Sequence, residues 1–331
     1  MLKNPLVTVV TCTYNKFETI LSTIESVLLQ DYPEIEYIIA DDGSQNFPYD
    51  TICNYIECKR KENLKDFRII RNEKNLGTVK NINGAFKSAK GKYIMGLAGD
   101  DLFFSDSVIS KVIDEMEKKN SMLMITTRLV CDQKFRPQYF LPHGLFHNIL
   151  KKFDTAEKQY GLFVSGQDFA MASGSAMYFR KEYLDKNGYF DERYILWEDG
   201  PFLEHYLRKN KIDMAYEIVS IKYQLGGIST AECTNEKLLR DSQLFDDTDR
   251  INNLEEINHF YKALTLYNLK SKSMKGIYRV KMIVLHPIIS MYKLIYRAVY
   301  IFAKYIDRQI VKRRLEVKYA GDKICISTAR R

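Results

Sequence analysis

The sequence predicts an α/β protein with a Rossmann-like, mostly parallel central sheet flanked by helices and followed by a helical C-terminal tail. Short β-branched runs recur in the first hundred residues, amphipathic helical patterns separate them, and cations concentrate near the end of the chain. Strands joined by helical crossovers pair in parallel, with right-handed connections. A chain of 331 residues, 46% apolar and 28% charged, has room for one large α/β domain and an appendage.

Each element follows from its residue pattern. Residues 6–12 form a short apolar run typical of a buried strand, and residues 17–28 place apolar side chains at helical spacing. The same patterns predict strands at 35–40, 67–70, 93–97, 122–130 and 175–179, and helices at 49–63, 78–89, 106–119 and from 199 onward. Residues 131–165 show weak periodicity and predict a loop-rich insertion, whereas 235–275 look helical and polar.

Three loops follow predicted strands at their carboxyl ends: Thr13-Tyr14-Asn15, Asp41-Asp42-Gly43-Ser44 and Gly99-Asp100-Asp101. Ligands of such sheets bind at this edge. Taken singly, each loop is an ordinary surface turn. Taken together, their clustered carboxylates repel one another unless a cation or a donor group binds there. Carboxylate oxygens suit Mg²⁺ or Mn²⁺, and because the chain has no phosphate-binding glycine loop, we expect a metal to carry any bound phosphates.

Short motifs recur along the chain in a fixed order. The first half contains Val9 to Asn15, Asp41 to Ser44, Asn75-Leu76-Gly77 with Lys80 and Asn83, Gly91 to Ile94, and Gly99-Asp100-Asp101. The second half contains Gly174, Arg180-Lys181, Gly188 to Asp191, and Trp197-Glu198-Asp199. In this order and spacing, over residues 5–225, the motifs resemble those of the family 2 glycosyltransferases, which have the GT-A fold, and the second set is similar to that family's acceptor-side segment. Each motif is weak alone, and the ordered combination is specific.

The resemblance implies an inverting transfer of a sugar from a nucleoside diphosphate sugar, expected to be UDP-linked, to a hydroxyl group. The acceptor would be a glycan or a lipid-linked saccharide in surface polysaccharide synthesis. It also implies that Asp100 and Asp101 bind Mn²⁺ or Mg²⁺ and that Asp199, beside Glu198, is the catalytic base. The expected donor-binding residues are Thr13, Tyr14, Asn15, Asp41, Asp42, Asn75, Gly77, Lys80 and Asp100.

Two positions depart from the family pattern. Ala98 stands where the first Asp of the metal-binding Asp-x-Asp motif is expected, which removes one carboxylate. Ile82 replaces a frequent arginine, which leaves Lys80 as the candidate cation near the phosphates; the alternative is a solvated helix-surface lysine. These departures keep two other functions open: a non-catalytic scaffold that binds sugar nucleotides, and a nucleotidyltransferase on a similar sheet.

The Glu198-Asp199 pair precedes an apolar helical pattern. A sugar hydroxyl is a poor nucleophile, so a carboxylate must accept its proton. Acidic residues at the start of a helix also stabilise the helix locally. A capping role is compatible with a catalytic role, because a capped helix holds the base rigidly. The neighbouring Trp197 is either a core residue or a platform for the acceptor sugar. His143 and His147, in the predicted insertion, lack evident partners for a metal site.

The C-terminal tail is basic. Residues 270–331 contain 16 Lys and Arg but three acidic residues, a net charge of +13, so the rest of the chain carries −5 of the total +8. Apolar and aromatic residues between 277 and 306 interleave with Lys293, Arg297 and Lys304, as in interfacial membrane helices. The longest uncharged run covers 282–292, shorter than the about 20 residues of a spanning helix.

We therefore expect the tail to bind an anionic membrane surface; the alternative is a helix packed on the protein's own body. Nucleic acid is not an expected partner, because no nucleic-acid-binding motif accompanies the charge. No secretory signal precedes the first predicted strand, and the six cysteines lack the CxxC spacing, so we expect a cytoplasmic protein peripheral to the inner face of the membrane. The predicted organisation is a glycosyltransferase domain at 1–230, with nucleotide-sugar (1–104) and acceptor (105–230) halves, and an extension at 231–331.

Overall fold

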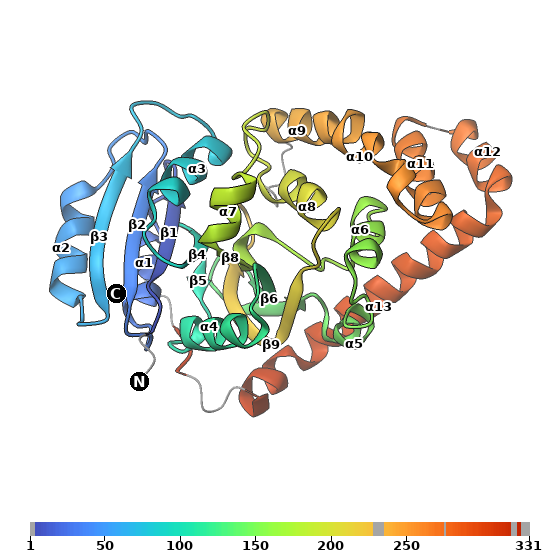
Figure 1. Ribbon diagram of the computed structural model, residues 1–331. Helices are drawn as coiled ribbons and strands as arrows, with labels where there is room; N and C mark the ends of the chain where they lie inside the picture. The colour runs from blue at the N-terminus through green and yellow to red at the C-terminus, as the bar shows by residue number, and fades with distance from the viewer. Residues whose placement is uncertain (1–3, 228–234, 275, 319–322, 326–331) are drawn as a thin grey trace.

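A computed structural model describes residues 4–227, 235–274, 276–318 and 323–325, and it confirms the α/β fold (Figure 1). Within these residues a nine-stranded sheet runs in the order β3-β2-β1-β4-β8-β6-β9-β5, with β7 paired to β6. The strands are β1 (Val7–Thr13), β2 (Ile35–Asp41), β3 (Leu64–Arg71), β4 (Tyr93–Ala98), β5 (Leu102–Phe103), β6 (Leu123–Cys131), β7 (Pro137–Leu141), β8 (Met177–Arg180) and β9 (Asp213–Gln224).

The sheet changes character at its middle. Strand β1 pairs in parallel with β2 and β4, and β2 pairs in parallel with β3, as the helical crossovers predict. Beyond β4 the sheet is mixed: β8 lies antiparallel to both β4 and β6, whereas β6 and β9 are parallel. The expected parallel pairing is confirmed in the nucleotide half, and the acceptor half adds antiparallel pairs through β5, β7 and β8.

Helices cover both faces of the sheet (Figure 1). One buried cluster joins α1, α2 and α4 to the sheet, and a second joins α3, α6, α7, α8 and α9 to the opposite face. The helices are α1 (Ile20–Leu28), α2 (Tyr49–Lys59), α3 (Thr78–Ser88), α4 (Val108–Lys119), α5 (His147–Leu150), α6 (Ala156–Val164), α7 (Lys181–Asn187), α8 (Asp199–Leu207), α9 (Glu236–Asp247), α10 (Asp249–Asn252), α11 (His259–Ser273), α12 (Ile277–Leu285) and α13 (Pro287–Lys318).

Two parts of the sequence prediction need correction. The predicted loop-rich insertion at 131–165 contains β7, α5 and α6, whose short lengths leave too few turns for a clear periodicity. Strand β9 was not predicted at all, although it is the longest strand described. Its pairing with β6 shifts register twice, and these irregularities interrupt the alternation of buried and exposed side chains that would have marked it in the sequence.

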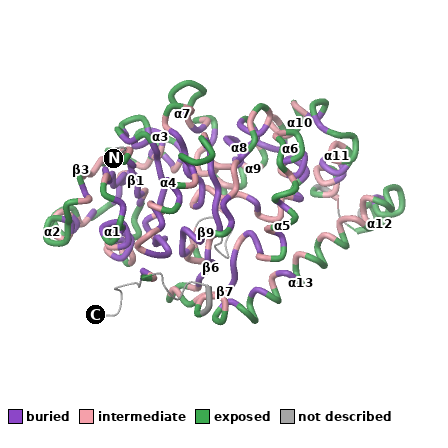
Figure 2. The backbone as a smooth tube through the Cα atoms, turned by 60° about the horizontal axis from the view of Figure 1, so that its bottom comes forward, coloured by how far each residue is buried: buried purple, intermediate pink, exposed green. Residues whose placement is uncertain are grey.

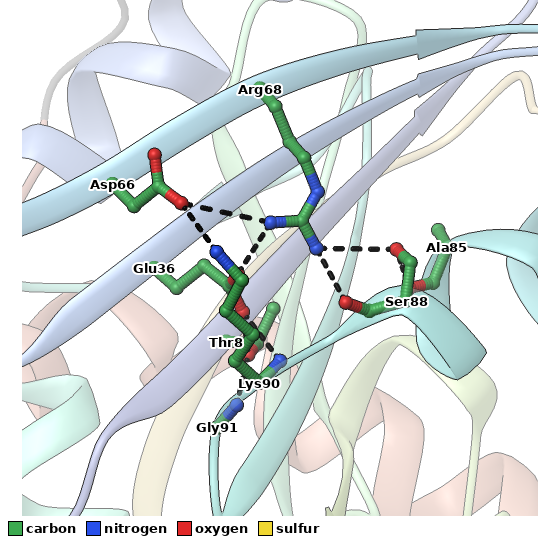
Figure 3. Close-up of polar contacts among 8 residues, drawn as sticks. All are labelled: Thr8, Glu36, Asp66, Arg68, Ala85, Ser88, Lys90 and Gly91. Carbon is green, nitrogen blue, oxygen red and sulfur yellow. Dashed lines mark hydrogen bonds and ion pairs between the residues drawn. The ribbon is translucent and has the colours of Figure 1, made fainter.

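The amino ends of the parallel strands meet in a closed polar network (Figure 3). Glu36, which is 1% exposed, accepts hydrogen bonds from Thr8 Oγ1 at 2.6 Å, Lys90 N at 2.8 Å and Arg68 Nη1 at 2.6 Å. Gly91 N in turn donates to Thr8 Oγ1. Both carboxylate oxygens of Glu36 are thus satisfied by donors from three other segments, so this network joins β1, β2, β3 and the turn before β4.

The C-terminal helices leave the body and return to it (Figures 1 and 2). Helix α13 packs an inner stripe against β7 and the turn that follows: Ala303, Asp307 and Val311 are buried, and Asp307 Oδ2 lies 2.8 Å from Nδ1 of buried His143. Farther along, Cys325 N donates to Phe104 O next to β5. In the described residues, no helix combines the length and the apolar character that crossing a membrane requires.

Candidate active site

The loops after β1, β2 and β4 converge at the carboxyl ends of the strands, as predicted for a ligand site. Asp42 N donates to Thr13 O, and Gly99 N donates to Cys12 O, which ties the second and third loops to the first. Asn15, with a positive φ of 51°, bridges the first two loops: its N donates to Ser44 Oγ, and its Oδ1 accepts from Gln45 N. Tyr14 beside it is 45% exposed and open to a ligand.

Asp41 and Asp42 are both buried, and protein donors already occupy most of their oxygens. Asp41 Oδ2 accepts from Ser44 N and Arg71 Nε, whereas its Oδ1 is buried without a partner. Asp42 accepts from Asn72 Nδ2, Leu76 N and Gly77 N. The structure therefore gives Asp42 a clear part in fixing the Asn75–Gly77 loop, beside its predicted contact with the donor. Asn75 itself is partly exposed.

Asp100 and Asp101 form the tight turn after β4. Thr23 Oγ1 donates to the carbonyl oxygens of Gly99 and Asp101 and so fixes the turn to α1. Asp101 is 1% exposed; its Oδ1 accepts from Gln224 N at 2.9 Å, and its Oδ2 is buried without a partner. Burial, with the adjacent charge of Asp100, holds the pKa of Asp101 well above its usual range, and burial also raises the pKa of Asp100.

This pair suits a divalent cation. An unpartnered buried carboxylate oxygen beside a second, partly exposed carboxylate is the arrangement that bound Mg²⁺ or Mn²⁺ stabilises. Lys16 Nζ lies 3.9 Å from Asp100 Oδ2 and donates to Gly226 O, so a cationic side chain already reaches the site. In the described part of the chain, no group of three or more Asp, Glu, His or Cys side chains is placed to hold a metal, so two carboxylates are the protein ligands that this site offers.

Glu198 and Asp199 stand at the start of α8, side by side. Gly174 N donates to Asp199 Oδ2 at 2.7 Å, and a Cβ added at Gly174 would meet Glu198 Oε1 at 2.7 Å, so a larger residue here would displace the Glu198 side chain. Burial, and then the charge of Asp199, raise the pKa of Glu198 to about 8. At neutral pH Glu198 is thus mostly protonated, which distinguishes it from its neighbour as a proton donor.

Backbone contacts hold this acidic pair in place. Asp241 on α9 is fully buried, and its Oδ2 accepts hydrogen bonds from three consecutive N–H groups, those of Ile195, Leu196 and Trp197. Val79 N donates to Ile195 O, which joins the first turn of α3, directly after the Asn75–Gly77 loop, to the same segment. Sequence reasoning missed Asp241, because a single acid in a polar helix carries no signal of the backbone that it binds.

The segment that leads to the acidic pair lies against the donor-side loops. Gly77 N donates to Asp42, and a Cβ added at Gly77 would meet Ile195 O at 2.7 Å, so Ile195 packs directly on this loop. Sequence reasoning also missed Arg128 on β6, whose guanidinium interacts electrostatically with Asp199 and Asp101.

Four other residues that the sequence singled out are less closely integrated. Lys80 is exposed on α3, where its charge acts on Glu192, and in the described part of the chain it forms no hydrogen bond or ion pair with the acidic loops. Trp197 packs its ring over Gly200 and 5.0 Å from Phe245, as a partly buried core residue does. His147 Nε2 lies 3.0 Å from Pro142 O, and its ring stacks on Tyr216, whereas His143 pairs with Asp307.

Comparison with known proteins identifies the family of the chain. Residues 8–188 match the family described as glycosyl transferase family 2, and the chain belongs to that family. An uncharacterized glycosyltransferase of Haemophilus influenzae is 25% identical over 247 residues, which are 70% of this chain and 69% of that protein. An Escherichia coli UDP-Glc:alpha-D-GlcNAc-diphosphoundecaprenol beta-1,3-glucosyltransferase, WfaP, is 36% identical over 109 residues, 32% of this chain and 40% of WfaP.

Solved structures share the fold. Staphylococcus aureus TarS 1-349 in complex with UDP-GlcNAc superimposes with a TM-score of 0.53 at 15% identity, covering 93% of this chain and 92% of that one. The mannosyltransferase PcManGT of Pyrobaculum calidifontis, in complex with GDP-Man and Mn²⁺, has a TM-score of 0.51 at 15% identity and covers 94% and 89%. Together with the family match, these likenesses confirm the GT-A fold and support glycosyltransferase activity.

Proposed function

We propose that this protein transfers a sugar, with inversion, from a UDP-sugar to a hydroxyl group of a glycan or lipid-linked acceptor during surface polysaccharide synthesis. The observation that carries the proposal is the position of Glu198 and Asp199: these two carboxyl groups follow Ile195, which packs on Gly77 and Val79 beside the donor-side loops. The relatives named for glycosyl transfer, one of them acting on a diphosphoundecaprenol-linked sugar, support the substrate class.

In this proposal each acidic group has a separate role. Asp199, held by Gly174 N, accepts the proton of the acceptor hydroxyl as that oxygen attacks the anomeric carbon. Glu198, protonated at neutral pH because its pKa is about 8, adds no second negative charge and leaves Asp199 as the base. The Tyr14–Asn15 and Asp41–Asp42 loops bind the base and ribose, with Asn75, Gly77 and Lys80 completing the donor side.

Asp100 and Asp101 would hold Mn²⁺ or Mg²⁺, which when bound supplies positive charge to the diphosphate leaving group. Asp101 Oδ2 is available for this because no protein donor reaches it, and Gln224 N fixes the other oxygen. Lys16 lies at the same edge and would add a cation toward the phosphates. The absence of a carboxylate at Ala98 leaves these two aspartates as the acidic ligands of the motif.

A product assay tests this function. The protein is incubated with a panel of nucleotide sugars and Mn²⁺, with and without polyprenyl-diphosphate saccharides, and the released nucleotide is identified. Release of UDP with formation of an extended saccharide supports the proposal. Release of pyrophosphate instead identifies a nucleotidyltransferase, and tight donor binding without turnover for every acceptor identifies a scaffold; either result contradicts it.

We further propose that α12 and α13 attach the protein to an anionic cytoplasmic membrane surface. Large apolar side chains form an outer stripe on α13, where Ile288 is 72% exposed, Ile295 54% and Phe302 57%. Exposed cations, including Arg297, Lys312 and Arg313, accompany the stripe. Lys293 and Lys304, expected at the membrane, instead face the body: Lys293 Nζ donates to Asn268 Oδ1 and lies over the ring of Tyr267, and Lys304 Nζ lies over the ring of Tyr139.

Vesicle sedimentation tests this attachment on the full chain. Ile295→Gln/Phe302→Gln should lose most of the binding to vesicles rich in phosphatidylserine, whereas Leu239→Gln, which removes an exposed leucine from α9, should bind as the unmodified protein does. Salt should weaken binding without abolishing it. The attraction between charges is screened over a distance of about 10 Å at an ionic strength of 0.1 M, whereas apolar contacts are not screened. Equal sedimentation of both variants would identify the outer stripe as a surface for another partner.

A further inference from the structure

A polar cavity lies between α7, α8 and α10, whose places in the fold are labelled in Figure 1. Its volume is about 410 Å³, which is within the range of small-molecule sites. Glu204 lines it from α8, five residues beyond Asp199, hence about 140° around the helix and about 7.5 Å farther along its axis. Neither Glu198 nor Asp199 is among the described residues that line the cavity. The cavity is therefore separate from the acidic pair.

The glutamate in this cavity is buried and has an unused acceptor. Glu204 is 4% exposed, and its two carboxylate oxygens differ. Oε1 accepts hydrogen bonds from Tyr160 Oη at 2.8 Å and from Asn253 Nδ2 at 2.9 Å. Oε2 accepts none from the residues that the structure describes, although Glu204 lines the cavity. A desolvated carboxylate oxygen without a donor is costly, so this oxygen is left for a donor group on a ligand.

A network of hydrogen bonds fixes the other polar groups that line the cavity. Arg193 Nη2 donates to both carboxylate oxygens of Asp249, at 3.0 and 3.1 Å, and Arg193 Nε donates to Asp191 Oδ2 at 2.7 Å. Asn253 Nδ2, which donates to Glu204, also donates to Asp249 O at 3.4 Å. The network joins α8, α10 and the turn before α8, so the cavity has walls that are already formed without a ligand.

The charges in the cavity favour a neutral ligand. Both arginines that line it already have carboxylate partners: Arg193 is paired with Asp191 and Asp249. Arg208 is paired with Glu256, at 2.7 Å. A bound anion would therefore have to displace a carboxylate. Hydroxyl groups require no such exchange, because each of them can both donate and accept a hydrogen bond.

Aromatic rings and free polar side chains complete the lining. Tyr183 and Tyr189 contribute partly exposed rings. His205 and Asn252 contribute exposed side chains that form no hydrogen bond within the part of the chain that the structure describes. Rings combined with a few placed donors and acceptors are typical of small-molecule sites. We propose that the cavity binds a neutral saccharide, whose hydroxyls donate to Glu204 and accept from Asn252 and whose ring lies against the tyrosines.

The walls of the cavity continue into the segment that carries the proposed base. Residues 191–193 form one wall, and Asp241 holds the chain just beyond them through Ile195 N. Helix α8 carries Asp199 at its start and Glu204 farther along. A glycan that reaches both places would be held at two points, so loss of the cavity site should raise the KM of acceptors of several sugars and leave that of a single-sugar acceptor unchanged. This kinetic consequence rests on the proposed function, whereas saccharide binding by the cavity does not.

Saturation-transfer NMR on the full chain tests the site without requiring turnover. The probes are neutral methyl glycosides and disaccharides of glucose, galactose and N-acetylglucosamine. At least one should bind the unmodified protein, and Glu204→Gln should weaken that binding about tenfold, as expected for lost hydrogen bonds to a charged group. His205→Ala/Asn252→Ala, which removes two exposed side chains, should have a similar effect and provides a second variant should Glu204→Gln fold poorly. Lys209→Ala is the matched control: it removes an exposed side chain beyond the end of α8 that does not line the cavity, and it should bind normally.

Asp199→Asn separates the cavity from the catalytic pair. The inference requires at least one probe whose binding the two cavity variants weaken and Asp199→Asn does not. Binding of no probe, equal binding by the cavity variants and the unmodified protein, or loss of binding in Asp199→Asn alone would overturn it. Displacement of the saccharide by inorganic phosphate or by ethanolamine would also overturn it, because the cavity would then be a site for charged groups. Absence of UDP release from every donor would contradict the proposed function and leave saccharide binding unaffected.

Discussion

The two ends of the parallel half of the sheet hold buried carboxylates in opposite states. At the amino ends, Glu36 receives donors on both oxygens, from Thr8, Lys90 and Arg68 (Figure 3). At the carboxyl ends, Asp101 has a donor on one oxygen and none on the other. Burial is nearly the same, so exposure does not distinguish them. A satisfied carboxylate holds the fold together, whereas a carboxylate left unsatisfied in the folded state is available to a ligand.

The largest effect on transfer should come from the metal-binding pair. Asp100→Ala removes one carboxylate from the site, and the loss of leaving-group stabilisation should lower kcat/KM about 10³-fold. The check is a steady-state assay across Mn²⁺ concentrations, with excess chelator as a parallel condition. Full activity of the unmodified protein in chelator, or of the variant in Mn²⁺, would show that the Asp100-Asp101 pair holds no catalytic metal.

Asp199→Asn should have the next largest effect. The amide keeps the shape of the side chain but cannot accept the acceptor's proton, so kcat should fall about 10²-fold while UDP affinity is retained. Transfer rates and calorimetric UDP binding provide the measurement. Glu198→Gln is the matched comparison, since Glu198 is already mostly protonated at neutral pH. A greater loss with Glu198→Gln than with Asp199→Asn would exchange the roles of the two residues.

Asp241→Asn should have an intermediate effect. Its carboxylate accepts hydrogen bonds from three N–H groups of the segment that leads to Glu198. The amide of the variant would form weaker hydrogen bonds, which should let the acidic pair move. We expect kcat to fall about tenfold, since small displacements of catalytic groups are costly, with donor KM nearly unchanged. Lower stability with unaltered kcat would limit Asp241 to holding α9 on the body.

Glu36→Gln should change transfer least and stability most. It breaks the network at the amino ends, and we expect a loss of about 2 kcal/mol in the free energy of unfolding, with kcat per folded molecule within about twofold of the unmodified value, since catalysis depends on the opposite end. Urea denaturation and active-site-normalised rates measure the two quantities. A fall in kcat matching that of Asp199→Asn would remove the contrast between the two ends.

The pH dependence of stability should sharpen the same contrast. The pKa of Glu198 is about 8 in the folded state and close to 4.5 when unfolded, so between these values the folded protein binds more protons. Its contribution to stability is therefore complete below pH 4.5 and declines as pH rises toward 8. Urea denaturation at pH 6 and pH 9 should show a smaller loss of stability for Glu198→Gln than for the unmodified protein. Identical losses would mean that Glu198 titrates normally.

Much of the fold follows from local pattern. Strands β1, β2 and β4 are apolar runs buried on both faces, and α1 and α3 lie between them in sequence, so their positions were predicted within a few residues. The irregular strand β9 and the short elements between 131 and 165 could not be predicted, because bulges and single helical turns erase periodicity. The donor-side loops were found because the carboxyl ends of parallel strands meet at one edge.

The sequence by itself determined the GT-A class and the loops at the sheet edge, because these depend on short-range patterns in a fixed order, and it predicted Asp100-Asp101 and Glu198-Asp199 as the acidic pairs of the site. The tertiary structure alone showed which oxygens are satisfied. It gave Asp42 and Asp241 backbone partners and split α13 into inner and outer stripes. Those distinctions depend on contacts between residues more than a hundred positions apart in some cases, as for His143 and Asp307 on α13, and no local pattern records them.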